Sequence, residues 1–313
     1  MGIRFERKAV LAKLETTYGT DSTPTGVANA VLLKNVEINP LNGEAVPREI
    51  IRAGYGTMAG WFVGRHVTIT ARIDLAGAGA AGTAPAYGPL LRACGLAETV
   101  TAGTKVDYTP VHSGFESLSI YYNHEGTRHI AAGVRGTAKL RFTKRRTPEI
   151  ELSLIGLWKS DSSVALPALT TTAWKDPLPS TPANTTAFTI DDQAVLGSSF
   201  ELDLGMECAY RDLLNSEEII VRERKPKLMA LIEELPFATK NFFALVGAAP
   251  VPIVYTHGVG AGKIVDISVP LAQLQPIARQ EEDTVSSSWR AIGCSWASGT
   301  LMSTIFPAPT PCV

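Results

Sequence analysis

HVTITARIDL, residues 66–75, decides the fold class, because apolar and polar residues alternate along it without a break. Val67, Ile69 and Ile73 stand at odd positions, and the even positions are polar. A period of two places successive side chains on opposite faces of an extended strand. The stretch therefore predicts a half-buried strand. Similar alternation predicts antiparallel strands and hairpins at 116–122, 200–204, and 139–143 with 149–154.

Helical signals are few and short. Residues 87–94 and 238–246 have apolar residues at helical spacing, and each stretch is followed by glycine, at Gly95 and Gly247. Glycine is the preferred residue just after a helix because it adopts a left-handed backbone without strain. The predicted class is all-β with short helices.

The hairpin around residues 144–148 carries a charge pattern. A register centred near residue 145 would place Arg141 opposite Glu149, and it would place Lys139 opposite Glu151. Opposite charges facing each other across two strands stabilise the pair. We therefore expect a charge-paired strand face. The basic tip beyond it is expected to be solvated or to contact a neighbouring subunit or ring; it consists of Lys144, Arg145 and Arg146.

Composition narrows the class of protein. The chain has 313 residues, a formal net charge of −1, and four scattered cysteines. A single core rarely grows beyond roughly 250–300 residues, which favours two domains. The charge gives no basic excess for tight nucleic-acid binding. The cysteines lack zinc-like spacing and predict reduced thiols. No signal-peptide pattern and no apolar run near 18 residues occur, so no membrane contact is expected.

Segments in the first half of the chain resemble segments in the second half, in the same order. Residues 30–38 resemble 194–202, and 47–51 resemble 210–214, at an offset of about 164. Further matches follow in the same order: 73–75 with 232–235, 90–95 with 243–247, 107–110 with 254–257, and 155–158 with 292–296. This order predicts a tandem duplication. The predicted parts are domain 1 with an N-terminal arm (1–160), a linker rich in Ser, Thr, Pro and Ala (161–186), and domain 2 with a Pro-rich tail (187–313).

Three stretches resemble nucleotide-binding or metal-binding motifs, but each departs from the motif or from the structure that the motif requires. Residues 77–82 match GxGxxG, but Pro85 and Pro89 interrupt the helix that a dinucleotide site requires, so a flexible loop is favoured. Residues 258–263 fail as a phosphate loop at His257 and Ile264 and predict a hairpin turn. Residues 124–129 space two histidines five apart, unlike HExxH, and also predict a tight turn. We expect no enzyme activity and no catalytic, cofactor or metal residue.

A succession of segments carries a family resemblance: 15–20 (ETTYGT), 36–38, the strand 67–75, 84–96 (APAYGPLLRACGL), 108–110, 117–122 and 133–136. This order resembles the tail tube (major tail) proteins of siphovirus-type bacteriophages. The resemblance implies tandem β-sandwich or half-barrel domains that close into a β-barrel ring on oligomerisation. It also implies that stacked rings form the hollow tube through which genomic DNA passes into the host.

The resemblance implies partners and a location. The first partner is the chain itself, as a trimer of tandem domains in stacked pseudo-hexameric rings or, alternatively, as a hexamer. The tape measure protein and DNA would occupy the lumen without specific binding. Tail terminator and distal tail proteins would be further partners. The protein would be made in the host bacterial cytoplasm and reside in the virion. Expected ring contacts come from the arms 1–28 and 159–186 and from the loop 54–64, whose interface candidates are Tyr55, Met58, Trp61 and Phe62. The alternative is that Trp61 and Phe62 pack on their own domain.

Alternative functions remain open at this stage. Another tail, baseplate or secretion-tube component would share the fold and form rings or caps of other sizes. A β-sandwich binding or adhesion module would stay monomeric. An enzyme would require nucleotide binding at the glycine-rich loop.

Overall fold

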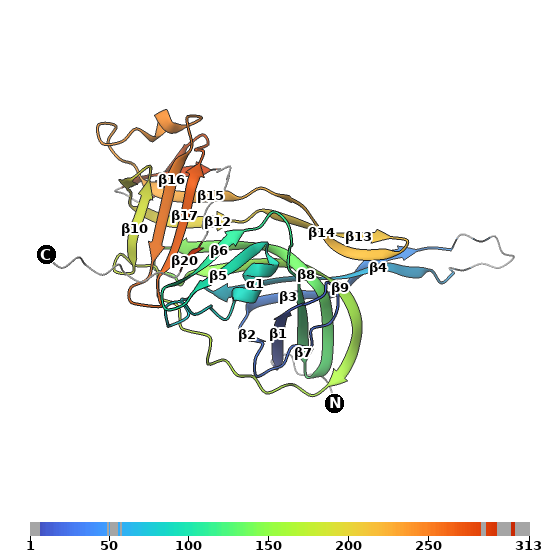
Figure 1. Cartoon of the computed structure of the whole chain (residues 1–313). Helices are drawn as coiled ribbons and strands as arrows, with labels where there is room; N and C mark the ends of the chain where they lie inside the picture. Colours follow the sequence, from blue (N-terminus) through green and yellow to red (C-terminus); the bar gives the residue numbers. More distant parts are fainter. Residues whose placement is uncertain are drawn as a thin grey trace.

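The strands expected from period-two alternation are present and form two sheets packed face to face (Figure 1). The computed structural model describes residues 7–48, 50, 56, 58–282, 286–292 and 302–303. In this part of the chain strands predominate and both sheets are open at their ends, which confirms the all-β class. The first sheet contains β1 (Lys8–Leu14), β2 (Ala30–Val31), β3 (Lys34–Val46), β4 (Trp61–Asp74), β7 (Leu118–His124), β8 (Gly126–Thr143), β9 (Glu149–Val164), β12 (Gly197–Asp203), β15 (Lys227–Glu233), β18 (Ala278–Glu282) and β19 (Ser286–Ile292).

The second sheet and two smaller elements complete the fold. The second sheet contains β5 (Leu96–Thr101), β6 (Lys105–Pro110), β10 (Thr185–Ile190), β11 (Gln193–Ala194), β16 (Val251–His257), β17 (Val265–Ala272) and β20 (Met302–Ser303). A separate hairpin consists of β13 (Met206–Leu213) and β14 (Ser216–Arg224). The helices are α1 (Gly88–Ala93) and the 3₁₀ helix η1 (Phe242–Leu245).

The first sheet is continuous across both halves of the chain. Its antiparallel order runs β3-β4-β9-β8, and the C-terminal part of β8 then pairs with β12, followed by β15, β19 and β18. The N-terminal part of β8 pairs with β7, which continues to β1 and β2. Because β9 covers one edge of β8, β7 and β12 share the other edge.

The core lies between the two sheets. The odd positions of β4 point inward, and Val67, Ile69 and Ile73 are buried as their alternation predicts. An aromatic cluster joins both sheets and both halves of the chain: the ring centroid of Phe142 lies 4.7 Å from that of Tyr255, and Phe200 stacks on Tyr255 at 4.6 Å. One continuous hydrophobic cluster therefore extends from Val10 to Leu274.

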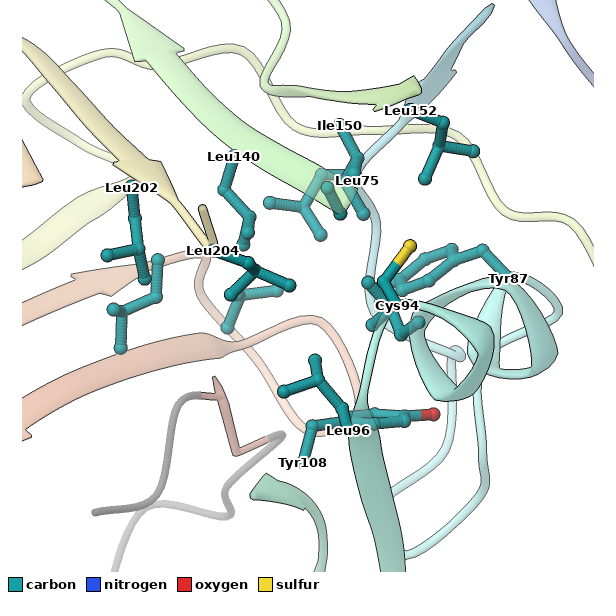
Figure 2. Close-up of a cluster of buried hydrophobic side chains, with 14 of the residues drawn as sticks. Leu75, Tyr87, Cys94, Leu96, Tyr108, Leu140, Ile150, Leu152, Leu202 and Leu204 are labelled. Atoms are coloured by element: carbon teal, nitrogen blue, oxygen red, sulfur yellow. The ribbon is translucent and has the colours of Figure 1, made fainter. Parts of the chain in front are cut away.

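Figure 2 shows a neighbouring region of this core, where strand residues meet the helix. Leu140 of β8 and Ile150 of β9 share the interior with Leu204, which follows β12. Tyr87 and Cys94, at the two ends of α1, close the same region. Helix α1 thus contributes its apolar residues to the seam between the halves.

The two helix predictions have different outcomes. Helix α1 ends as expected before Gly95, which has a left-handed φ of 78°. The second prediction, 238–246, shortens to η1, because the side chain of Asn241 accepts hydrogen bonds from the backbone N–H groups of Phe243 and Ala244. This cap starts the helix at Phe242 and leaves the preceding residues in a turn.

The segment predicted as a linker is extended and bound to the body. Strand β9 continues to Val164, and later residues are tied down in sequence. Thr170 N–H donates to the Gly26 carbonyl at 3.0 Å, and Trp174 Nε1–H donates to the Ala30 carbonyl at 3.0 Å. The segment therefore forms part of the surface of the folded body. The Pro-rich residues 304–313 lie outside the described residues.

The two glycine-rich motifs pack against each other. Residues 258–263 form the turn between β16 and β17, as predicted. Gly79 N–H donates to the Gly262 carbonyl at 2.9 Å, and a Cβ built on Gly77 would lie 2.2 Å from that same oxygen. Only glycine permits so close an approach of two backbones. The loop 77–82 is therefore a packing contact between the halves.

Candidate assembly surfaces and polar sheet face

The outer part of the β3–β4 hairpin projects beyond the body of the molecule (Figure 1). Two of its aromatic side chains are exposed to solvent, Trp61 by 57% and Phe62 by 39%. Met58 is half-buried, and Tyr55 lies outside the described residues. Single exposed apolar residues are ordinary, but a cluster on a projecting element is typical of a binding surface. The exposed neighbours on this hairpin are Leu41, Val46 and Val63.

Contacts within the hairpin hold these aromatic rings in place. The Arg48 guanidinium lies 4.8 Å from the centre of the Trp61 ring. The Phe62 ring lies against Gly43 on the opposing strand, where a Cβ would come within 2.7 Å of it. The rings are thus ordered by the hairpin itself and keep a large part of their surface in water.

A second hairpin, β13–β14, points the same way as the first (Figure 1). Its tip also exposes apolar residues, Leu213 by 50% and Leu214 completely. The hairpin leans on the first half of the chain, where Tyr210 stacks on His66 of β4 with ring centroids 5.1 Å apart. The exposed apolar residues of the two hairpins therefore lie toward the same side of the molecule.

Arg135 of β8 fixes the second hairpin. Its Nη1–H donates to the Ile219 carbonyl at 2.8 Å, and its Nη2–H donates to the Phe115 carbonyl at 2.9 Å. The guanidinium also lies 4.5 Å from the centre of the Tyr18 ring, whose hydroxyl accepts the Ile219 N–H. Ile219 is completely buried. These contacts attach the hairpin to β8 as a rigid part of the body.

The face of the first sheet that points away from the core carries a ladder of ion pairs over five strands. Arg72 contacts Glu151 at 2.7 Å, and Glu151 also accepts from Arg141 at 2.7 Å. Glu201 of β12 then receives Arg141 at 3.0 Å and Lys139 at 2.8 Å. At the other end, Lys34 of β3 pairs with Asp74 and Glu149. Four cations and four carboxylates balance, so the ladder is neutral.

Electrostatics at the ladder favours the charged forms. Burial alone would raise the pKa of Glu201, but the hydrogen bonds and charges of Lys139 and Arg141 outweigh it and lower the pKa below its ordinary value. The hydrogen bond from Arg141 to Glu151 raises the pKa of the guanidinium. Each cation of the ladder is therefore engaged by a carboxylate at neutral pH.

The predicted register of the β8–β9 hairpin is confirmed. Arg141 pairs with Glu149 and Lys139 pairs with Glu151 along the strands. The ion pairs do not follow this register, however: Arg141 contacts Glu151 diagonally, and Lys139 contacts Glu201 of β12 diagonally. Glu201 also receives Arg141, which lies directly opposite it. Sequence reasoning missed Glu201, although its position in the alternating stretch 200–204 marks it as outward-facing.

The basic tip is exposed but anchored through its backbone. Lys144, Arg145 and Arg146 are all exposed. Arg145 N–H donates to the Ser180 carbonyl at 2.9 Å, and Ser180 N–H donates to the Arg146 carbonyl at 2.8 Å. Arg146 also borders a hollow of about 650 Å³ beside Arg72. The tip therefore lies at the rim of the polar face.

Other candidate motifs are structural in the described part of the chain. Glu125 and Gly126 form the tight turn between β7 and β8, and both flanking histidines, His124 and His129, stack on Tyr122. Cys94 is buried, and burial raises the pKa of its thiol. Among the described residues, His, Cys, Asp and Glu do not gather into a group able to hold a metal ion.

Comparison with known proteins places the chain in a family. None of the helices in the described residues is long and apolar enough to cross a membrane. A search among curated proteins found no match. The sequence model of a family described as phage tail tube protein matches residues 6–221, which is more than half of the chain and extends into β14. The chain therefore belongs to the phage tail tube protein family and is a structural protein of the phage tail.

Proposed function

We propose that three copies of this chain join into a pseudo-hexameric ring and that stacked rings form the hollow tail tube of a siphovirus-type phage. The observation that carries this proposal is the neutral, ion-paired outer face of a sheet that spans both halves of the chain. In the ring this face lines the lumen, and genomic DNA passes along it without specific binding.

A repeated strand order supports the tandem arrangement. The first half runs β3-β4-β9-β8 across the sheet, and the second half runs β12-β15-β19-β18. In the first half, α1 follows β4, and the β5–β6 hairpin of the second sheet comes next. In the second half, η1 follows β15, and the β16–β17 hairpin comes next. The family resemblance implies rings of six units. If each chain supplies two of these units, three chains complete one ring.

Pairing registers support the same duplication. Ile38 pairs with Ile69. Leu202 matches Ile38 in the internal repeat, and Leu228 precedes Ile232 by four residues, as Ile69 precedes the matching Ile73; Leu202 and Leu228 also pair. The two matches lie in different stretches of the sequence, so their agreement in register is independent support. The match of 155–158 with 292–296 is two residues out of step with this register, because the pairings of β4 with β9 and of β15 with β19 make Ile150 equivalent to Trp289.

The polar face suits a DNA conduit. A protein binds DNA chiefly by releasing counterions when free cations meet phosphates. The cations of the ladder, Lys34, Arg72, Lys139 and Arg141, already contact carboxylates. The lumen would thus offer DNA a hydrated wall with little net attraction.

The projecting hairpins suit stacking. The two hairpins project toward one side of the molecule, so their exposed apolar residues would lie on one face of a ring and contact the next ring. Burial of aromatic side chains is the usual source of binding energy at protein interfaces. The tape measure protein would occupy the lumen, and tail terminator and distal tail proteins would close the two ends of the tube.

The test is electron microscopy of the purified protein in negative stain, with averaged end views. Hollow rings or tubes with three chains per ring are expected. Six chains per ring would retain the tube and refute the tandem arrangement. A protein that stays monomeric at high concentration would refute the tube and favour a binding module.

A further inference from the structure

We propose that ring closure pairs strand β18 of one chain with strand β3 of the next, and that the junction reproduces the β8–β12 pairing inside the chain. The inference rests on the proposed ring and names the edges that form it. The partner surface is a second copy of this chain.

Strands β3 and β18 are the two ends of one antiparallel series. Within the described residues, β3 pairs only with β4, and β18 pairs only with β19. Eight strands lie in the series from β3 to β18, and every neighbouring pair is antiparallel. An even number of alternating strands leaves the two ends running in opposite directions. The end of one chain can therefore add to the start of the next in antiparallel fashion.

The intrachain junction supplies the geometry. Strand β8 ends the first four-strand unit and β12 begins the second, and they pair through Leu140 with Leu202 and Arg141 with Glu201. Strand β18 occupies the place of β8 in the second unit, and β3 occupies the place of β12 in the first. The pairing that joins β8 to β12 inside the chain would therefore be repeated between β18 of one chain and β3 of the next.

The register follows from the pairings already described. Ile150 pairs with Ile73, and Trp289 pairs with the corresponding Ile232, so Ile150 and Trp289 hold equivalent positions. Their partners in turn are Leu140 and Arg279. Since Leu140 faces Leu202 and Leu202 matches Ile38, Arg279 should face Ile38 of the neighbouring chain. Gln280 should then face Glu37.

Irregularities in β3 confine the junction to this register. The pairing of β3 with β4 is irregular between Lys34 and Glu37 and again between Asn39 and Glu44. Residues 37–39 pair without a bulge, as do 44–46 in the projecting part of the hairpin, and β18 is itself five residues long. Bulges and short edge strands protect a sheet from pairing with unrelated strands. The regular window therefore selects a short, matching edge.

The two kinds of junction differ in charge. Inside the chain, Arg141 and Lys139 both contact Glu201. At the equivalent positions of β18 stand Gln280 and Ala278, which carry no charge. The junction between chains therefore depends on backbone hydrogen bonds more than on ion pairs, and salt should affect it less than it affects exposed pairs.

Cysteine pairs test the register. Two variants place cysteines at facing positions, Glu37→Cys with Gln280→Cys and Ile38→Cys with Arg279→Cys. Facing residues of antiparallel strands lie about 4.5–5.5 Å apart at Cα, which a disulfide spans. The mismatched control, Glu37→Cys with Arg279→Cys, puts the two side chains on opposite faces. The single variants control for pairing with native cysteines.

Covalent dimers and trimers should appear on non-reducing gels after oxidation of assembled protein, at least tenfold above the mismatched control. Hydrogen exchange of the unmodified protein provides a second measurement, because amides at 37–39 and 278–282 should gain protection on assembly. Rings or tubes that form without crosslinks or protection at these edges would refute the junction and keep the proposed function. Failure of the unmodified protein to form rings would instead refute the proposed function, and the junction with it.

Discussion

Replacement of Trp61 and Phe62 by alanine tests the stacking role of the β3–β4 hairpin. These side chains are 57% and 39% exposed, and each ring lies against residues of its own hairpin. The double variant should fold normally, because surface substitutions away from buried networks usually change the free energy of unfolding by less than about 0.5 kcal/mol. The double variant should therefore differ from the unmodified protein only in how tightly its rings stack.

The magnitude follows from the exposed area. Aromatic side chains of about 150–250 Å² with these exposures leave roughly 200 Å² of the pair in water. At about 25 cal/mol per Å², complete burial against the next ring would contribute roughly 5 kcal/mol per chain. Burial of half that area still gives about 2.5 kcal/mol, or close to a 70-fold change in affinity.

The assay is the critical concentration for tube formation, measured by sedimentation and checked by electron microscopy. We expect Trp61→Ala with Phe62→Ala to raise it by at least tenfold while single rings persist. Leu196→Ala is the matched control, since Leu196 is 69% exposed on another part of the surface. An unchanged critical concentration, with urea unfolding equal to that of the unmodified protein, would refute the stacking role.

Three further predictions concern the core, the polar face and pH. Phe142→Ala should lower the free energy of unfolding by about 3–5 kcal/mol in urea titrations, because Phe142 is 1% exposed and packs on Tyr255. Glu151→Gln with Glu201→Gln should make tubes retain DNA at low salt, in filter-binding assays where Glu207→Gln does not. Burial lowers the pKa of His257 below the value of the unfolded chain, so stability should fall as pH drops below about 6.5, by at most about 1.4 kcal/mol per pH unit, and His257→Gln should remove this slope.

Local features of the fold were predictable from sequence because they depend on neighbouring residues. Alternation at 66–75 fixes which side chains of β4 are buried, and a one-residue shift would turn all of them to water. The charge pattern around residue 145 likewise gave the register of β8 and β9. In both cases the information lies within one strand or one hairpin.

Pairings between distant strands were not predictable in the same way. Nothing in residues 139–143 specifies β12 as their partner, because many alternating strands would satisfy the same pattern. Glu201 therefore escaped notice as the acceptor of two cations. The shared core was hidden for the same reason, since the contact of Phe142 with Tyr255 joins residues more than a hundred positions apart.

The shared core bears on the proposed tandem arrangement of two units in one chain. If the first half were released before β12, the edge of β8 at 139–143 would be exposed and Phe142 would lose Phe200 and Tyr255. An open edge beside an exposed aromatic residue invites pairing with any available strand. Covalent linkage supplies β12 at a high effective concentration, so this junction forms during folding. In the proposed ring of three chains, half of the junctions would then exist before assembly, and the proposed pairing of β18 with β3 would depend on protein concentration.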